Sequence, residues 1–129
     1  RNIRENYLHD FIQVQHINWN CLHKLSHNKV HGVIKADTII FSDCVYNEDG
    51  AIALFNAICA ILKRKGNVVG VLPDFRVGLD LFEKMMETNN FEPTVIPHGR
   101  LPKGEDFICS GGGGKNYRLI HWIDNRPEE

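Results

Sequence analysis

The sequence predicts an α/β fold with a mostly parallel sheet that ends in an antiparallel pair of strands. Short apolar runs bounded by polar or turn-forming residues occur at 37–43 and 67–72, and such runs are typical of strands covered on both faces. A segment with apolar residues at helical spacing follows each run, which favours right-handed crossovers between parallel strands. The last two strand patterns, at 91–96 and 117–123, have no helix between them, so they can pair antiparallel at one edge of the sheet.

The N-terminal part is expected to hold a helix and then a strand. Ile3, Tyr7 and Leu8 fall on one face of a helix, which indicates the late part of an amphipathic helix over 1–8. Alternating apolar and polar residues then predict a strand over 11–17. The helix pattern has no start methionine and no capping residue ahead of it, so we expect a piece of a longer chain, cut inside a helix.

A first long helix is expected between the two apolar strands. Asn47 to Asp49 offer N-caps for it, and apolar residues at helical spacing continue to Lys65. Gly66 is expected to stop the helix just after its C-cap. The basic residues at 63–65 would then form a solvated helix end that is compatible with the helix dipole.

A second helix is expected over 77–89, and a long connection joins the last two strands. Gly111 to Gly114 lie in that connection. They read as part of a flexible hairpin and not as a phosphate loop, because a phosphate loop lies between a strand and a helix and ends in Lys-Ser or Lys-Thr. The second helix directs these apolar side chains inward, the methionines as core filler: Leu81, Phe82, Met85 and Met86.

Composition bounds the classes of function. The chain has 129 residues, 43% of them apolar, which is enough for the core of one domain. Its formal net charge of −1 argues against non-specific nucleic-acid binding, which needs a basic surface. No apolar stretch reaches the roughly 20 residues that span a bilayer, and the N-terminus lacks the apolar core of a signal peptide. The four cysteines form no CxxC pair and read as reduced thiols. We expect a cytoplasmic protein, with the nucleus also open, and its oligomeric state is left open.

Several residues with functional side chains follow the predicted strands. The carboxyl ends of parallel strands meet at one edge of the sheet, where ligands bind. The candidates at these ends are Asn18, Trp19, Ser42, Asp43, Cys44, Tyr46, Asp74 and Arg76.

Each candidate allows a functional and a structural reading. Asp43 can accept a hydrogen bond from a ligand amine or hydroxyl, or it can cap the next helix. Tyr46 can close a pocket or pack at its rim. Trp19 can stack on a flat heterocycle or cover the core, and Asn18 can bond the edge of such a ring.

Asp74 and Arg76 follow the predicted strand over 67–72 and also allow two readings. They can pair with each other on the surface, but an exposed ion pair stabilises by only about 0–1 kcal/mol, so a purely structural reason for them is weak.

Other sets of residues are not expected to carry chemistry. His23, His27 and His31 are four residues apart, but the segment is loop-like and lacks a nearby carboxylate, so we expect solvated histidines and no metal site. No Ser-His-Asp or Cys-His set is expected either.

The chain resembles the seven-stranded (class I) S-adenosylmethionine-dependent protein-lysine methyltransferases. Asp43-Cys44-Val45-Tyr46 matches their Asp/Glu-x-x-Tyr/Phe signature, and 37–42 resembles their fourth strand. Asn18-Trp19 resembles the Asp-Trp beside the adenine, with an amide in place of the usual acid. Asn2 to Asn6 looks like the Asn-x-x-x-Asn of the preceding helix, and 76–82 resembles the stretch after the fifth strand.

The resemblance implies a Rossmann-like class I methyltransferase sheet that lacks its first strands. Residues 1–129 would then be the C-terminal portion of a single methyltransferase domain, without its N-terminal cofactor loop, and inactive alone. Asn18, Trp19, Ser42 and Asp43 would bind S-adenosylmethionine.

The resemblance also implies the reaction and its substrate. Asp43 and Tyr46 would act on the amine of a lysine presented by a protein, and Tyr46, Asp74 and Arg76 would contact that substrate. A small-molecule amine N-methyltransferase and a non-catalytic methyltransferase-like binding module are the alternatives. A flavodoxin-like nucleotide binder fits the terminal strand pair poorly.

Overall fold

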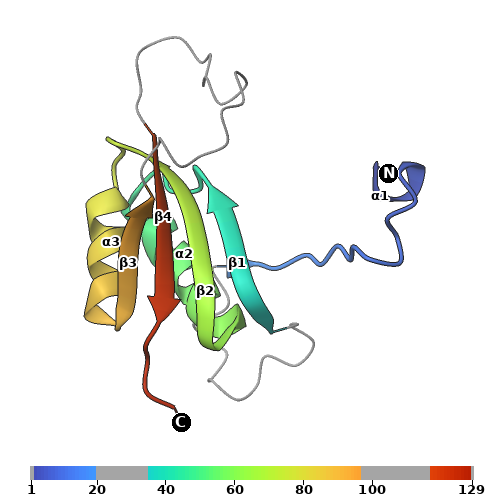
Figure 1. Ribbon diagram of the computed structural model, residues 1–129. Helices are drawn as coiled ribbons and strands as arrows, with labels where there is room; N and C mark the ends of the chain where they lie inside the picture. Colours follow the sequence, from blue (N-terminus) through green and yellow to red (C-terminus); the bar gives the residue numbers. More distant parts are fainter. Residues whose placement is uncertain (1, 20–34, 97–116, 129) are drawn as a thin grey trace.

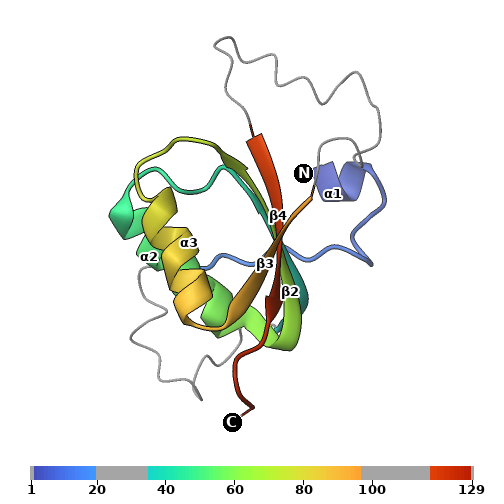
Figure 2. The same ribbon diagram turned by 60° about the vertical axis from the view of Figure 1, so that its left-hand side comes forward.

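The computed structural model describes residues 2–19, 35–96 and 117–128. In this part of the chain, four strands form one sheet in the order β1-β2-β4-β3 (Figure 1). The strands are β1 (Ala36–Ser42), β2 (Leu62–Pro73), β3 (Phe91–Ile96) and β4 (Tyr117–Asp124). The helices are α1 (Asn2–Glu5), α2 (Glu48–Ile61) and α3 (Leu79–Thr88). The two long helices, α2 and α3, lie on the same face of the sheet (Figure 2).

The sheet is mixed, with one parallel pairing among the described strands. β1 and β2 run parallel, with Ile39 opposite Val68 and Ser42 opposite Val71. β4 pairs antiparallel with β2 on one side and with β3 on the other. The expected terminal antiparallel pair is therefore confirmed. The expectation of a mostly parallel sheet is wrong for the described strands, because β1–β2 is their one parallel pair.

The expected strand over 11–17 is absent from the structure. These residues have no assigned secondary structure beyond a turn, and Phe11 and Val14 are each 84% exposed. A strand is stabilised by hydrogen bonds to a neighbour and by an apolar face packed on a core. The sequence alternation supplied the pattern, but the described sheet does not extend to this segment, which leads away from β1 towards α1 (Figure 1).

Helix α2 begins as expected and ends earlier than expected. Its N-cap is Asn47, whose Oδ1 accepts a hydrogen bond from the Gly50 N–H at 2.7 Å. The helix ends at Ile61, and the residues up to Lys65 belong to β2. Lys65 itself has a positive φ of 61°, so the left-handed residue precedes Gly66. Pairing with β1, which starts with Ala36 opposite Leu62, replaces the last expected helical turn.

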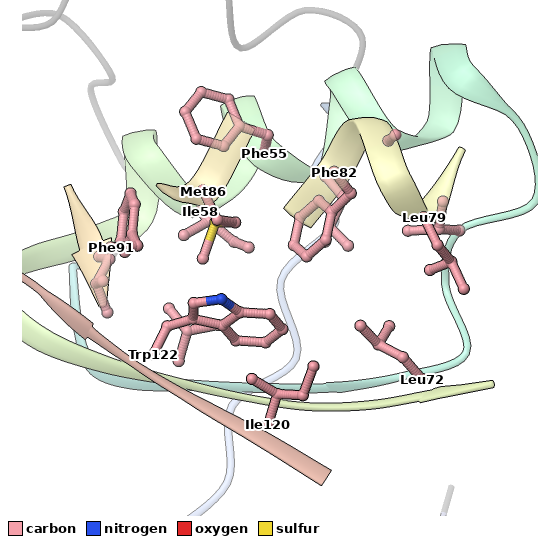
Figure 3. Packing of buried hydrophobic residues seen from close by; sticks show 14 residues of the cluster. Phe55, Ile58, Leu72, Leu79, Phe82, Met86, Phe91, Ile120 and Trp122 are labelled. Carbon is pink, nitrogen blue, oxygen red and sulfur yellow. The ribbon is translucent and has the colours of Figure 1, made fainter. Parts of the chain in front are cut away.

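The core lies between the helices and the sheet. Phe82 and Met86 of α3 are fully buried, and Leu81 and Met85 pack against the same cluster, so all four expected inward positions are confirmed. Trp122 of β4 lies under these helices (Figure 3). Its ring stacks on Phe41 at a centroid distance of 6.2 Å and meets the Phe82 ring edge-on at 5.8 Å. These contacts fix β1, β4 and α3 relative to one another.

A buried ion pair closes the C-terminal end of β4. Asp124 is fully buried and accepts hydrogen bonds from the backbone N–H and the guanidinium of Arg126 at 2.8–3.0 Å. Arg126 also lies over the Phe91 ring and donates to the carbonyl of Cys59. Burial by itself raises the pKa of Asp124, but the hydrogen bonds and the charge of Arg126 outweigh it and lower that pKa below its usual value. Burial also raises the pKa of the Cys59 thiol.

Candidate functional site

Asp43 occupies a special backbone position just after β1. Its N–H donates to the carbonyl of Val71 at 3.0 Å, which extends the β1–β2 pairing by one residue. Its φ is 48°, in the left-handed region that Asp and Asn tolerate better than most residues. The chain therefore turns sharply at Asp43 and leaves the sheet there. Because Asn47 caps α2, the alternative reading of Asp43 as the helix cap is wrong.

The carboxylate of Asp43 pairs with the guanidinium of Arg76. Nη2 of Arg76 lies 3.2 Å from Oδ1 and 3.3 Å from Oδ2, and the Oδ2 contact has hydrogen-bond geometry. The side chains are 29% exposed for Asp43 and 20% exposed for Arg76, so the pair is half-buried. Oδ1 itself is buried and accepts no hydrogen bond. A buried acceptor without a donor is costly, so this oxygen has capacity for a hydrogen bond from a ligand.

Tyr46 contacts the same guanidinium of Arg76. The central carbon of the Arg76 guanidinium is 4.7 Å from the centroid of the Tyr46 ring, which is a cation–π distance. Tyr46 is 60% exposed. The ring therefore contacts the ion-pair partner of Asp43 and leaves much of its own surface open.

Close packing of two loops brings these three residues together. The loop after β1 carries Asp43 and Tyr46, and the loop after β2 carries Arg76. A Cβ atom at Gly78 would lie 2.4 Å from the carbonyl oxygen of Asn47, so the loops touch through their backbones. Arg76 accepts a hydrogen bond from the Leu79 N–H at 3.2 Å, which closes a turn ahead of α3.

Asp74 belongs to a second group of charges. Its carboxylate lies 3.5 Å from Nε of Arg118 on β4, and Arg118 also donates to Glu83 of α3. The structural reading in which Asp74 pairs with Arg76 is wrong, because Asp74 pairs with Arg118 and Arg76 pairs with Asp43. Asp74 thus helps to join β2, β4 and α3, and its carboxylate is 31% exposed.

The remaining candidates lie nearby in sequence or pack on the core. Ser42 is exposed, and its carbonyl accepts a hydrogen bond from the Cys44 thiol at 3.2 Å. Trp19 is partly buried against the hydrophobic cluster, which matches its reading as a cover over the core. Asn18 is exposed. The structure therefore brings Asp43, Tyr46 and Arg76 into one group.

The described residues offer neither a metal site nor a helix that could span a membrane. Among them, no group of three His, Cys, Asp or Glu side chains could hold a metal ion. None of the helices in this part of the chain is long and apolar enough to cross a membrane. His23, His27, His31 and the glycines at 111–114 lie outside the described residues.

Two contacts in this region were not predicted from the sequence. Arg118 links Asp74 to Glu83, and Gly78 lets the two loops touch. Gly78 was expected to lie inside the helix over 77–89, but it has a φ of 94° and precedes α3. The glycine itself was the available signal, because glycine adopts a positive φ readily. Arg118 gave no local signal, since its partners are far away in sequence.

Comparisons with known proteins place this chain in a family. A family model described as lysine methyltransferase matches residues 1–89. An O-methyltransferase family protein from Burkholderia thailandensis has a similar fold, with a TM-score of 0.61 and 11% sequence identity over 98% of this chain. This chain spans 40% of the length of that protein. No curated protein matches. The mixed α/β sheet has a methyltransferase as its structural neighbour, and the family match covers more than half of the chain. The chain belongs to the lysine methyltransferase family.

Proposed function

We propose that the full-length protein is an S-adenosylmethionine-dependent methyltransferase that methylates a lysine side chain of a protein. The observation that carries this proposal is Asp43, which lies one residue beyond β1 and whose buried Oδ1 has no hydrogen-bond donor. The exposed ring of Tyr46 contacts the same guanidinium as Asp43 does. A carboxylate with a free acceptor beside an aromatic rim suits an amine. The family match supports the same reaction.

We also propose that this chain is the C-terminal part of one Rossmann-like class I methyltransferase domain. In the described sheet β1 is an edge strand, and Ile40 on it is 78% exposed. An exposed apolar edge strand is prone to pair with another strand, so it is normally covered or paired. Additional strands of the same domain would pair with β1 and complete the sheet. The share of the structural neighbour that this chain spans, 40%, leaves room for them.

The described residues fit S-adenosylmethionine in part. Bound S-adenosylmethionine supplies a methyl group that its sulfonium already activates, so the protein mainly contributes proximity and orientation. Asp43 would accept a hydrogen bond through Oδ1, with Ser42 beside it at the same strand end. Asn18 would accept through its amide oxygen, and Trp19 would offer its ring to the adenine.

The chain's own residues would prepare the lysine. The attacking amine must be neutral, whereas a lysine in water is mostly protonated. Asp43 would hold the amine by a hydrogen bond, and the ring of Tyr46 would line the approach and exclude water from it. Asp74, held by Arg118, lies on the neighbouring loop and would contact a basic part of the protein substrate.

The test is to replace Asp43 by Asn in the full-length protein. Asn has nearly the same shape and tolerates a left-handed φ, so the substitution removes the charge and leaves the backbone unstrained. Transfer of a labelled methyl group to protein in a cell lysate is expected to fall about tenfold to a hundredfold, the effect of losing a hydrogen bond to a charged group. Asp37→Asn is the matched control, because Asp37 lies on the same strand and pairs with Lys63 in solvent. Its transfer rate is expected to match the wild type.

The same assay separates the alternatives. Unchanged labelling of protein by Asp43→Asn would remove Asp43 from the mechanism. Label that appears in the low-molecular-weight fraction would indicate a small-molecule amine as substrate. Calorimetry with S-adenosylmethionine adds a separate measurement, because absence of binding to the wild-type protein would indicate a non-catalytic binding module.

A further inference from the structure

We propose that Arg76 is a positioning residue, which holds the Asp43 carboxylate through Oδ2 so that Oδ1 remains available to a ligand. This inference rests on the proposed function of Asp43. It moves Arg76 from contact with the substrate, as the sequence suggested, to contact with Asp43 and Tyr46. The structure gives three independent reasons for the change.

The first reason is how the carboxylate oxygens divide their contacts. Nη2 of Arg76 lies within 3.3 Å of both oxygens, but it makes a hydrogen bond only with Oδ2. Oδ1, 3.2 Å from the same nitrogen, is buried and accepts no hydrogen bond. A lone carboxylate can turn about its last side-chain bond, since that rotation has a broad, roughly two-fold preference. The hydrogen bond to Oδ2 restricts this rotation, so Arg76 determines which oxygen of Asp43 keeps its hydrogen-bonding capacity.

The second reason is that the guanidinium is already engaged on two sides. Its Nη2 meets the Asp43 carboxylate, and its central carbon lies over the Tyr46 ring, 4.7 Å from the centroid. A planar guanidinium can make an in-plane hydrogen bond and a stacking contact at once, whereas an ammonium group cannot do both in this geometry. With its side chain 20% exposed, Arg76 has little surface left for a substrate.

The third reason is that the backbone around Arg76 is held in place. The turn from Arg76 to Leu79 is closed by a hydrogen bond of 3.2 Å. Gly78 then lies against the carbonyl of Asn47, so the loop after β2 cannot move away from the loop after β1 without breaking this contact. A rigid support of this kind is what precise positioning of a functional group requires.

A double-mutant cycle on the full-length protein tests the inference. Arg76→Met removes the charge while keeping most of the length, Arg76→Lys keeps the charge without the planar group, and each is combined with Asp43→Asn. If Arg76 acts through Asp43, Arg76→Met alone lowers kcat/KM about tenfold, mainly through kcat, because an orientation is lost. Added to Asp43→Asn, it changes kcat/KM by less than about twofold, because the two residues act as a unit. Arg76→Lys recovers part of the loss.

A control and a stability measurement separate positioning from a general structural role. Lys63→Met breaks the Lys63–Asp37 pair, which joins the N-terminal ends of β1 and β2, away from Asp43. This control is expected to leave kcat/KM unchanged. The melting temperature of every variant is measured alongside. A loss of melting temperature without a loss of kcat/KM in Arg76→Met would overturn the inference.

The cycle also distinguishes this inference from the proposed function. If Asp43→Asn lowers activity and Arg76→Met lowers it equally in both backgrounds, Arg76 acts independently of Asp43 and the inference is wrong. If Arg76→Met mainly increases KM, the inference is wrong and Arg76 contacts the substrate directly. If Asp43→Asn has no effect on kcat/KM, the proposed function of Asp43 is wrong, and so is the positioning role of Arg76 that rests on it.

Discussion

Gly78 lies so close to Asn47 that a Cβ atom there would be 2.4 Å from the Asn47 carbonyl oxygen. Gly78 also has a φ of 94°, a conformation that residues with a side chain rarely adopt. Asn47 caps α2, and Gly78 immediately precedes α3. The N-terminal ends of the two helices are therefore in close contact at the end of the sheet where Asp43 and Arg76 meet. Only glycine fits at position 78 in this contact, so the site depends on Gly78.

Gly78→Ala is expected to destabilise the full-length protein by about 3 kcal/mol, because it combines backbone strain with a steric clash. Urea denaturation followed by circular dichroism measures the change. Gly50→Ala is the matched control, since a Cβ there meets only Asn47 Oδ1, at 3.2 Å. We expect that control to change stability by less than about 1 kcal/mol. Equal effects of the two substitutions would mean that the loops are not pressed together.

Two substitutions of Tyr46 distinguish the role of its ring in activity from the role of its hydroxyl. Arg76 lies over the ring face, and much of the ring is exposed. Tyr46→Phe keeps the ring and is expected to retain methyl transfer within about threefold, whereas Tyr46→Leu loses the cation–π contact and the aromatic rim and is expected to lose about tenfold. Steady-state assays of the full-length variants check both values. A large loss in Tyr46→Phe would instead assign the role to the hydroxyl.

The sequence was informative where the determining contacts are local. Asn47 to Asp49 were expected to offer the cap of α2, and Asn47 provides it by accepting a hydrogen bond from Gly50, only three positions away. The inward face of α3 followed from helical spacing in the same way. The β3–β4 pair also followed, because an absent helix between two strand patterns leaves an antiparallel arrangement as the simple solution.

The expectations that failed depended on distant partners. A surface pair with Asp74 was the structural reading of Arg76, but Arg76 pairs with Asp43, which is 33 positions away. The segment 11–17 had the alternation of a strand, yet a strand needs a neighbour, and alternation does not specify one. Lys65 continued a helical pattern, and pairing of β2 with β1 prevailed over it. Local pattern thus located the candidate residues, but tertiary contacts determined which of them meet.

The Asp124–Arg126 pair predicts how stability depends on pH. The pKa of Asp124 is lowered in the folded protein, because Arg126 more than offsets the effect of burial. A carboxylate with a lowered folded pKa stabilises fully above its unfolded value, here 3.8, and this contribution is lost as the pH falls through the folded value. Asp124→Asn is expected to cost about 3 kcal/mol at pH 7, since it leaves Arg126 half-buried without its charge partner.

Urea denaturation of wild type and Asp124→Asn across pH 7 to pH 2 measures this difference. The gap between the two proteins is expected to be constant at neutral pH and to narrow below about pH 4. Asp37→Asn serves as control, because its ion pair with Lys63 is solvent-exposed and is worth about 0–1 kcal/mol. A gap that stayed constant down to pH 2 would show that the charge of Asp124 does not stabilise the fold.

Gly70 and Phe41 predict a compensating pair of substitutions in the core. They lie opposite each other in β2 and β1, and a Cβ on Gly70 would be 2.5 Å from Cζ of the Phe41 ring. Gly70→Ala is therefore expected to cost about 2 kcal/mol by overpacking.

Phe41→Leu is also expected to destabilise, because it removes the ring contacts to Phe82 and Trp122. The smaller side chain, however, leaves room for the new methyl group, so the double variant is expected to be more stable than the sum of the single effects by about 1–2 kcal/mol. Urea denaturation of the four proteins gives the coupling energy. Strict additivity would mean that the Phe41 ring does not lie across Gly70, because removing the ring would then give the new methyl group no additional space.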